Sequence, residues 1–300
     1  MEENPNKRAG IPGWLKLLLK IAVTIACVWY VSGKIDFKKA GLVFSNVNWL
    51  YLFFALIAFA GSKLLSAVRL NIYFRNIGIH LSAWQNIKLY WLGMFYNLFL
   101  PGSITGDAYK VILLTKKYTI PYKKTTAAVL LDRFSGLLGL GLLLAGYSVI
   151  ALHNPLSVAL IAAGSFAAVF LLFIIIKKGF PDFAGSFFST LLLGLLVQCC
   201  QVVCAYLIIV ALEIPFHTNE YIFIFLVSSV VSVLPLTIGG LGIREVVFLE
   251  GSKFFELMQE TSVVISLLFY LITLLVSAVG LIYVFNDPLK EKIKDPLLSP

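Results

Sequence analysis

The sequence has 300 residues, of which 60% are hydrophobic and 13% are charged, and its formal net charge is +9. Soluble domains carry about 25% charged residues, so most of the surface of this chain must face lipid. The positive charges are spread over loops and tails, and no nucleic-acid-binding motif is present. This pattern excludes a nucleic-acid partner and indicates an orientation signal in a membrane.

The apolar segments are long enough to cross a bilayer, which takes about 20 residues per helix. The first follows Lys7 and Arg8, is too long for a signal-peptide core and lacks a small-residue cleavage site, so we expect a retained helix. Six uninterrupted spans and two interrupted apolar stretches follow from the pattern. The predicted spans are 14–32, 49–68, 125–151, 156–176, 188–212 and 261–285, and the interrupted stretches are 84–115 and 219–250.

The segments outside these spans are too short to fold alone. We therefore predict a single integral membrane domain over 1–300, with polar tails at 1–13 and 286–300. The cysteines lie inside apolar runs without the spacing of a zinc site, and the histidines lie in different segments, so we expect no metal and no cofactor. These residues are Cys27, Cys199, Cys200, Cys204, His80, His153 and His217.

The two interrupted stretches contain similar sequences. LPGSITGDAYK at 100–110 aligns without a gap with LPLTIGGLGIR at 234–244. The shared pattern is L-P-x-[ST]-I-x-G-x-x-x-[KR], and both copies interrupt an apolar run. We interpret them as an internal duplication.

The distribution of lysines decides whether the interrupted stretches cross the membrane. Eight crossings would place the five lysines of 110–124, together with Lys177 and Lys178, outside the cell, against the positive-inside rule. Six crossings with two re-entrant hairpins place these lysines and both termini in the cytoplasm. Only the 33–48 loop, with three lysines, is discordant.

The predicted fold class is therefore an all-α polytopic membrane protein with eight hydrophobic segments. About six are full transmembrane helices, and two are re-entrant helical hairpins in an inverted repeat. Three full spans separate the hairpins, so the hairpins enter from opposite sides. In transporters this arrangement places the binding site near the midplane of the bilayer.

Two adjacent charges lie inside the span 125–151. At 1.5 Å per residue from Lys124, Asp132 and Arg133 are about 12 Å deep, where a charge costs about 2.5–3.5 kcal/mol. Two interpretations stay open: an Asp–Arg element that locks neighbouring helices, and charges that line an aqueous path.

The hairpins also carry candidate residues for an anion site. Asp107 and Lys110 share one face if a helix follows Ser103, and Ser103 and Thr237 are candidate N-caps of the returning arms. The N-terminal ends of both arms would then point their N–H groups at the midplane. A capped turn with a surface charge is the alternative for each motif.

The predicted site residues form two sets. The candidate headgroup-binding residues are Asp107, Lys110, Asp132, Arg133, Arg244 and Glu245. The candidate turn residues are Pro101, Gly102, Gly106, Pro235, Gly239, Gly240 and Gly242. No catalytic triad, HExxH motif or phosphate loop can be assembled, so no catalytic residue is predicted.

Other polar residues have simpler interpretations. Arg69 and Arg75 flank the inner end of the second span, where we expect contact with lipid headgroups. Gln198 and Gln201 lie within the fifth span. Interhelical hydrogen bonds explain these two amides as well as substrate contact does.

Three segments resemble motifs of the flippase-like membrane domain of the lysylphosphatidylglycerol synthase family. They are FLPGSITGDAYK (99–110), LLDRFSGLLGL (130–140) and LPLTIGGLGIREVV (234–247), and the resemblance covers about 10–290. The third segment matches at every position of its motif, whereas Thr105 stands where a glycine is usual in the first.

This resemblance implies movement of a phospholipid or another envelope lipid, such as a polyprenyl-linked or hopanoid lipid, across a bacterial-type cytoplasmic (inner) membrane. In two-domain members an aminoacyl-transferase domain follows the membrane domain. The sequence ends at Pro300, so we do not expect lysyl transfer.

We predict a lipid translocase whose anionic or zwitterionic headgroup binds near Lys110, Arg133 and Arg244. One alternative is an integral-membrane lipid-modifying enzyme with Asp132 or Glu245 as acid/base. The other is a membrane partner of a separate lipid or glycan synthase. The identity of the lipid, the energy source and the formation of a homodimer stay open.

Overall fold

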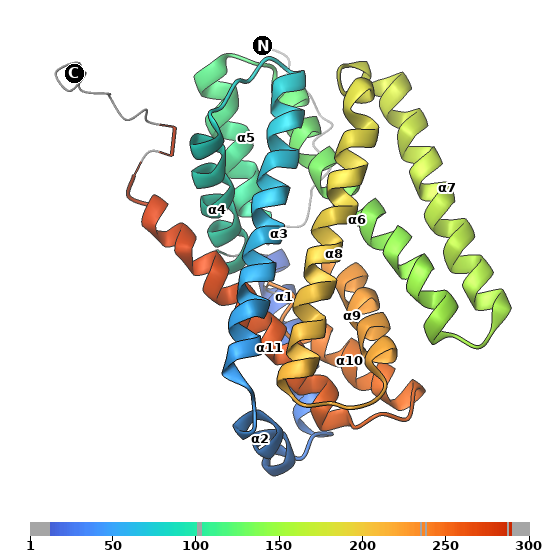
Figure 1. Ribbon diagram of the computed structural model, residues 1–300. Helices are drawn as coiled ribbons and strands as arrows, with labels where there is room; N and C mark the ends of the chain where they lie inside the picture. Colours follow the sequence, from blue (N-terminus) through green and yellow to red (C-terminus); the bar gives the residue numbers. More distant parts are fainter. Residues whose placement is uncertain (1–12, 101–103, 235, 238, 287, 290–300) are drawn as a thin grey trace, which may run out of the picture.

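The computed structural model describes residues 13–100, 104–234, 236–237, 239–286 and 288–289 (Figure 1). These residues form helices and loops and no strand, so the predicted all-α class is confirmed. The α-helices are α1 (Gly13–Ser32), α2 (Phe37–Ser45), α3 (Trp49–Asn76), α4 (Ala83–Phe99), α5 (Thr105–Tyr118), α6 (Tyr122–Ala151), α7 (Pro155–Gly179), α8 (Phe187–Ala211), α9 (Thr218–Val233), α10 (Ile243–Phe254) and α11 (Gln259–Ala278). Two 3₁₀ helices, η1 (Pro181–Ser186) and η2 (Val279–Tyr283), precede α8 and follow α11.

Five helical segments of the described chain are long and apolar enough to cross a membrane. They are Trp49–Asn76, Tyr122–Ala151, Pro155–Gly179, Pro181–Ala211 and Gln259–Tyr283, and each contains a predicted span or nearly all of one. A sixth is counted if α1 and α2, which meet at an angle of 88°, form one bent span. The discordant 33–48 loop is thus largely helix α2, whose N-cap Asp36 accepts hydrogen bonds from the backbone of Lys38 and Lys39.

Each interrupted stretch is a pair of short helices. The first comprises α4 and α5, and the second comprises α9 and α10; in each pair the two helices pack on each other. At 1.5 Å per residue, α5 is about 21 Å long and α10 about 18 Å long, less than the 30 Å of a hydrocarbon core. In Figure 1 the first pair lies in the upper half of the bundle and the second in the lower half. Both breaks therefore fall between the two ends of the bundle.

The two halves of the chain repeat one order of packing. In the first half, α4 contacts α3, and α5 contacts α6; in the second half, α9 contacts α8, and α10 contacts α11. The leading helices of the two halves, α3 and α8, pack against each other along the bundle (Figure 1). This order matches the internal duplication that the sequence indicates.

The basic loops gather at one end of the bundle. Lys124 forms an ion pair of 2.7 Å with Asp182, and Lys117 Nζ donates a hydrogen bond of 2.9 Å to the carbonyl of Leu289. The α6–α7 and α8–α9 loops lie at the other end (Figure 1). Placing Leu289 beside Lys117 agrees with six crossings, because eight would separate them.

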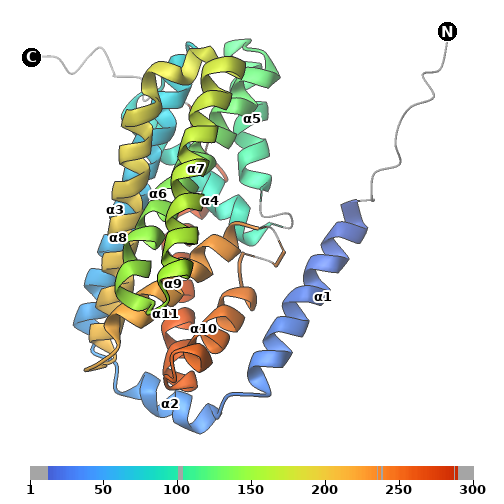
Figure 2. The ribbon, with the colours of Figure 1, turned by 90° about the vertical axis from the view of Figure 1, so that its right-hand side faces the viewer.

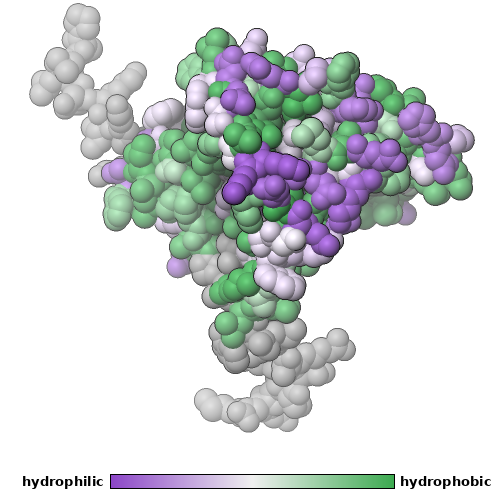
Figure 3. All heavy atoms as spheres, turned by 90° about the horizontal axis from the view of Figure 1, so that it is seen from below, coloured by the Kyte–Doolittle hydropathy of each residue, from purple (hydrophilic) through white to green (hydrophobic). Residues whose placement is uncertain are grey.

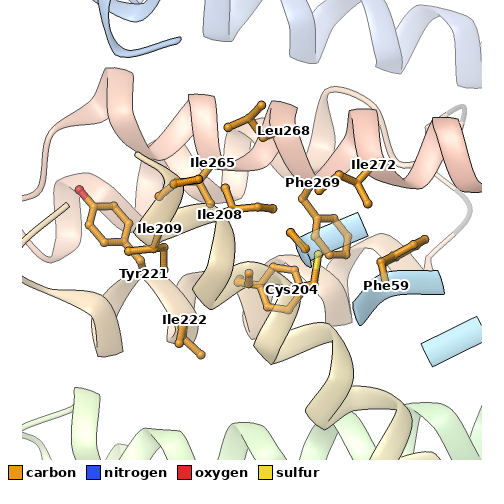
Figure 4. Packing of buried hydrophobic residues seen from close by; sticks show 14 of the residues in the cluster. Phe59, Cys204, Ile208, Ile209, Tyr221, Ile222, Ile265, Leu268, Phe269 and Ile272 are labelled. Atoms are coloured by element: carbon orange, nitrogen blue, oxygen red, sulfur yellow. The ribbon is translucent and has the colours of Figure 1, made fainter. Parts of the chain in front are cut away.

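Aromatic and aliphatic side chains from both halves form the larger core cluster (Figure 4). Phe269 of α11 meets Phe59 of α3 and Phe225 of α9 edge-on, with ring centroids 5.4 Å and 4.8 Å apart. Cys204 is fully buried within this cluster. The four cysteines of the sequence are all free thiols.

Glycines let α6 and α8 approach at backbone distance. A Cβ placed on Gly139 would lie 2.6 Å from the carbonyl carbon of Gly194, and one on Gly194 would lie 2.4 Å from the carbonyl oxygen of Ser135. Helices in membranes associate through such small residues, because lipid supplies little hydrophobic driving force.

The surface is sorted as a membrane protein requires. Figure 3, a view from below, shows hydrophilic residues gathered over the middle of one end and apolar residues around them. Of the five candidate spans, α7 is the least buried within the bundle: only 6% of its most apolar stretch is buried. It lies at the outer edge of the bundle (Figure 1).

Candidate functional site

A cavity of about 360 Å³ lies between the two helix pairs. Its wall includes Asn97 and Leu98 at the end of α4, and Gly239 and Gly240 from the break before α10. The long helices α3, α6, α8 and α11 complete it. The charged and amide side chains that line it are Lys63, Arg69, Asn97, Arg133, Gln198 and Gln201.

The turn before α10 depends on glycines. Gly239, Gly240 and Gly242 have φ values of +62°, +84° and +85°, a left-handed conformation that other residues adopt only with strain. A Cβ on Gly239 would also lie 2.5 Å from Leu98 Cδ1, so this turn touches the end of α4. Pro235 lies outside the described residues.

The start of α10 corrects one prediction. Its N-cap is Gly242 and not Thr237, because the helix begins only at Ile243. Glu245 Oε2 accepts a 2.6 Å hydrogen bond from the Gly242 N–H, and its Oε1 accepts one of 2.8 Å from Ser266. The buried Glu245 carboxylate therefore satisfies the helix start. Figure 2 shows α1 standing beside this region, and a Cβ on Gly242 would lie 2.8 Å from Cys27 Cβ.

The first pair is held at its own break by close packing. The Gly106 N–H donates a 2.9 Å hydrogen bond to Asn97 Oδ1. A Cβ on Gly106 would lie 2.0 Å from the Gly93 carbonyl oxygen, so α4 and α5 are in backbone contact there. Pro101, Gly102 and Ser103 lie outside the described residues. The N-cap of α5 is Ile104, so the prediction of Ser103 as N-cap is wrong.

Asp107 gathers two cations from neighbouring helices. It accepts a 3.1 Å hydrogen bond from Lys110 Nζ and pairs with Arg133 Nε of α6. Asn97 Nδ2 adds a contact of 3.3 Å. Lys110 is buried with its ammonium 4.8 Å from the Tyr90 ring centroid. Asp107 and Lys110 share a helix face as predicted, but only Arg133 of these charges lines the cavity.

Asp132 has a partner that the sequence does not indicate. Arg69 Nε lies 2.7 Å from Asp132 Oδ1, and the two side chains are 5% and 10% exposed. The expected contact of Arg69 with headgroups at the membrane surface is therefore wrong: the residue is buried inside the bundle, where a carboxylate from α6 compensates its charge. Asp132 and Arg133 belong to separate ion pairs.

The Arg69 guanidinium is only partly satisfied. Its Nη1 is buried without a hydrogen-bond partner among the described residues, and Arg69 lines the cavity. A Cβ on Gly136 would lie 3.0 Å from this nitrogen. The glycine thus makes room for the arginine beside the cavity.

Arg244 lies within the second pair and is absent from the lining of the cavity. Its Nη1 lies 3.3 Å from Ser229 Oγ and 3.5 Å from Ser228 Oγ. Its guanidinium carbon lies 4.8 Å from the Phe269 ring centroid and 5.9 Å from that of Phe225. Arg244 occupies the position of Lys110 in the repeat, and both cations lie over aromatic rings.

Lys63 is a cavity residue that was not among the predicted site residues. This half-buried residue of α3 lines the cavity, and its ammonium lies 4.4 Å from the Phe59 ring centroid. The available signal was a lysine in the middle of an apolar run. Gln198 donates a 3.1 Å hydrogen bond to the Gly136 carbonyl, which confirms the interhelical role, and it also lines the cavity.

Among the charged residues of the cavity and the two helix pairs described above, positive charge exceeds negative charge. The five cations are Lys63, Arg69, Lys110, Arg133 and Arg244, and the three carboxylates are Asp107, Asp132 and Glu245. Within this set of described residues, the five cations exceed the three carboxylates by two charges. No group of three or more metal-ligating side chains occurs within the described part of the chain.

The chain was compared with known proteins. A family model described as the lysylphosphatidylglycerol synthase TM region matches residues 17–186 and 183–280. No curated protein matches the chain.

Proposed function

Since this chain belongs to the lysylphosphatidylglycerol synthase TM region family, we propose that it moves a lipid with an anionic or zwitterionic headgroup between the leaflets of a bilayer. The family links the chain to membrane lipids, and the geometry of the cavity supports translocation. The observation that carries the proposal is the cavity where the two helix pairs meet, with Lys63, Arg69 and Arg133 in its wall.

The charges of the cavity favour an anionic group. No carboxylate appears among its lining residues, whereas three cations do. A buried charge is costly unless it is compensated, so a phosphate that enters would gain from the surplus positive charge. Arg69 Nη1, a buried donor without a partner among the described residues, offers a hydrogen bond to such a group.

The ion pairs suit a site that is alternately empty and filled. Asp107 compensates Arg133, and Asp132 compensates Arg69, when no headgroup is present. A phosphate can reach Arg133 while Asp107 stays paired with it, because the Arg133 side chain is 36% exposed whereas that of Asp107 is 14% exposed. The carboxylates thereby reduce the cost of keeping cations at this depth.

We further propose that the end carrying the basic loops faces the cytoplasm. Lys117 and Lys124 lie there, beside Leu289 and Asp182. The positive-inside rule favours this orientation, with both termini in the cytoplasm of a bacterial-type inner membrane.

The decisive measurement is lipid flipping in proteoliposomes. Purified protein is reconstituted with trace phosphatidylglycerol that carries a fluorophore on one chain, and membrane-impermeant dithionite reports the exchange between leaflets. Lys63→Met should slow the exchange at least about tenfold, which corresponds to about 1.4 kcal/mol of lost headgroup interaction. Lys178→Met, at an exposed lysine at the end of α7, is the matched control and should keep the wild-type rate.

Two results would overturn the proposal. Wild-type protein that exchanges phosphatidylglycerol, phosphatidylethanolamine and polyprenyl phosphate no faster than protein-free vesicles has no translocase activity. Mass spectrometry of the same lipids tests the alternative of a lipid-modifying enzyme, because a new product would indicate chemistry on the headgroup.

A further inference from the structure

A second hollow, of about 670 Å³, runs between α6 and α7. We call it the α6–α7 groove. Its lining is almost wholly apolar and includes Leu130, Phe134, Gly141, Leu160, Gly164 and Leu171. We call the cavity with Lys63, Arg69 and Arg133 in its wall the cationic cavity. It is a polar compartment, and the groove is an apolar one.

Small residues keep the groove open. A Cβ on Gly164 would meet nothing within 4 Å. Ser165 Oγ donates a 2.9 Å hydrogen bond to the Gly141 carbonyl, which ties α7 to α6 at this level. Besides this hydrogen bond, α7 packs mainly on α6 and η1. Figure 2 shows α7 lying over α6.

The groove and the cavity share one wall. Leu137 lines both of them, and its neighbours on α6 divide between the two: Phe134 faces the groove and Arg133 faces the cavity. On α9, Val230 lines the groove whereas Ser232 lines the cavity. The thickness of one side chain therefore separates the cations from the apolar compartment.

The shared residue lies within the length of the groove, away from both ends. On α6 the groove lining extends from Ala127 to Leu144, which is about 26 Å at 1.5 Å per residue. From Leu137 the groove extends about 15 Å toward Ala127 and about 11 Å toward Leu144. One leaflet of a hydrocarbon core is about 15 Å thick, so the groove reaches past the depth of one leaflet.

We propose that the α6–α7 groove binds one acyl chain of the same lipid whose headgroup occupies the cavity, a proposal that rests on the proposed function. The chain enters beside Leu137 and lies toward either end of the groove, so the tail can reverse its direction while the headgroup stays near the cations. We infer an acyl chain as the occupant because the groove adjoins the cationic cavity, and a phospholipid joins an anionic group to an apolar chain.

The experiment uses two lipid probes with the same diazirine-bearing acyl chain, one a phosphatidylglycerol and the other a diacylglycerol. Both are photo-crosslinked to the purified full-length chain in detergent micelles, and peptide mass spectrometry locates the label. We expect phosphatidylglycerol to label 127–144 and 160–175 at least about fivefold more than diacylglycerol. Lys63→Met combined with Arg133→Gln should remove that difference.

Filling the groove provides the matched comparison. Gly164→Phe places a ring in the groove and should lower groove labelling at least about fivefold, whereas Ala167→Phe, on an exposed position of α7 outside the lining, should not. Equal labelling by the two probes would overturn the proposal, because labelling that does not depend on the headgroup is what lipid that merely surrounds the protein would give. A dimer that Gly164→Phe converts into monomers, seen by light scattering, would overturn it in favour of a second copy of the chain.

The outcome is separable from that of the proposed function. Headgroup-dependent labelling without flipping would refute translocation while keeping the tail site. Flipping that continues at the wild-type rate in Gly164→Phe, with unchanged labelling, would refute the tail site while keeping translocation.

Discussion

Replacing Asp132 with alanine would leave Arg69 as a buried cation without its carboxylate. The two side chains are 5% and 10% exposed, and Nε lies 2.7 Å from Oδ1, so solvent screens this pair little. Removing one partner of a buried ion pair costs about 3–5 kcal/mol. The unfolding equilibrium constant should therefore change more than about 100-fold.

The assay is equilibrium unfolding in mixed detergent micelles, followed by tryptophan fluorescence. Asp182→Ala is the matched control, because Asp182 and Lys124 form an ion pair of the same 2.7 Å whose side chains are 40% and 49% exposed. An exposed pair contributes about 0–1 kcal/mol. The expected difference between the two alanine variants is thus at least about 2 kcal/mol.

A double variant separates the charge from the packing. Arg69→Met with Asp132→Leu removes both charges and should recover most of the loss from Asp132→Ala, because no uncompensated charge remains. The reasoning is refuted if Asp132→Ala destabilises no more than Asp182→Ala, or if the double variant is as unstable as Asp132→Ala.

Two further predictions follow from the packing and the loops. Gly106→Ala, whose Cβ would lie 2.0 Å from the Gly93 carbonyl oxygen, should lower stability by about 1–3 kcal/mol in the same unfolding assay. Gly61→Ala, where a Cβ meets nothing within 4 Å, should not lower it; equal losses would contradict the close contact. Single cysteines at Lys117 and His153, in a chain without the four native cysteines, should react with an impermeant maleimide from opposite sides of the membrane. Labelling from the same side would contradict the assignment of these loops to opposite ends.

The spans could be predicted from sequence because apolar length is a local property. The boundaries were less accurate: the second span was expected to end at residue 68, whereas α3 continues to Asn76. The arginine at 69 suggested an end at the membrane surface. A carboxylate 63 residues away keeps that arginine inside the bundle, and no local pattern reveals such a partner.

Part of the site could be predicted because some of its contacts depend only on local sequence. The i,i+3 contact of Asp107 with Lys110 follows from helix geometry alone. The capping of α10 by Glu245 depends on where the glycine turn ends, and the Ser/Thr rule placed the cap too early, at Thr237. Lys63 carried a signal in the sequence, a lone charge within an apolar span, which is by default a hypothesis of a functional site.

The contact between Gly139 and Gly194 restricts how the protein can move. The two helix backbones are so close that a methyl group does not fit between them, so no side chains lie between the helices that could repack. Sliding or tilting α6 against α8 would therefore break their contact outright, and these two helices must travel as a single body. Under the proposed translocation, the change that exposes the cavity first to one side and then to the other would come from elements other than this pair. The pair carries Arg133 on α6 and Gln198 on α8, so a lipid that crosses would pass polar groups whose positions relative to each other are fixed.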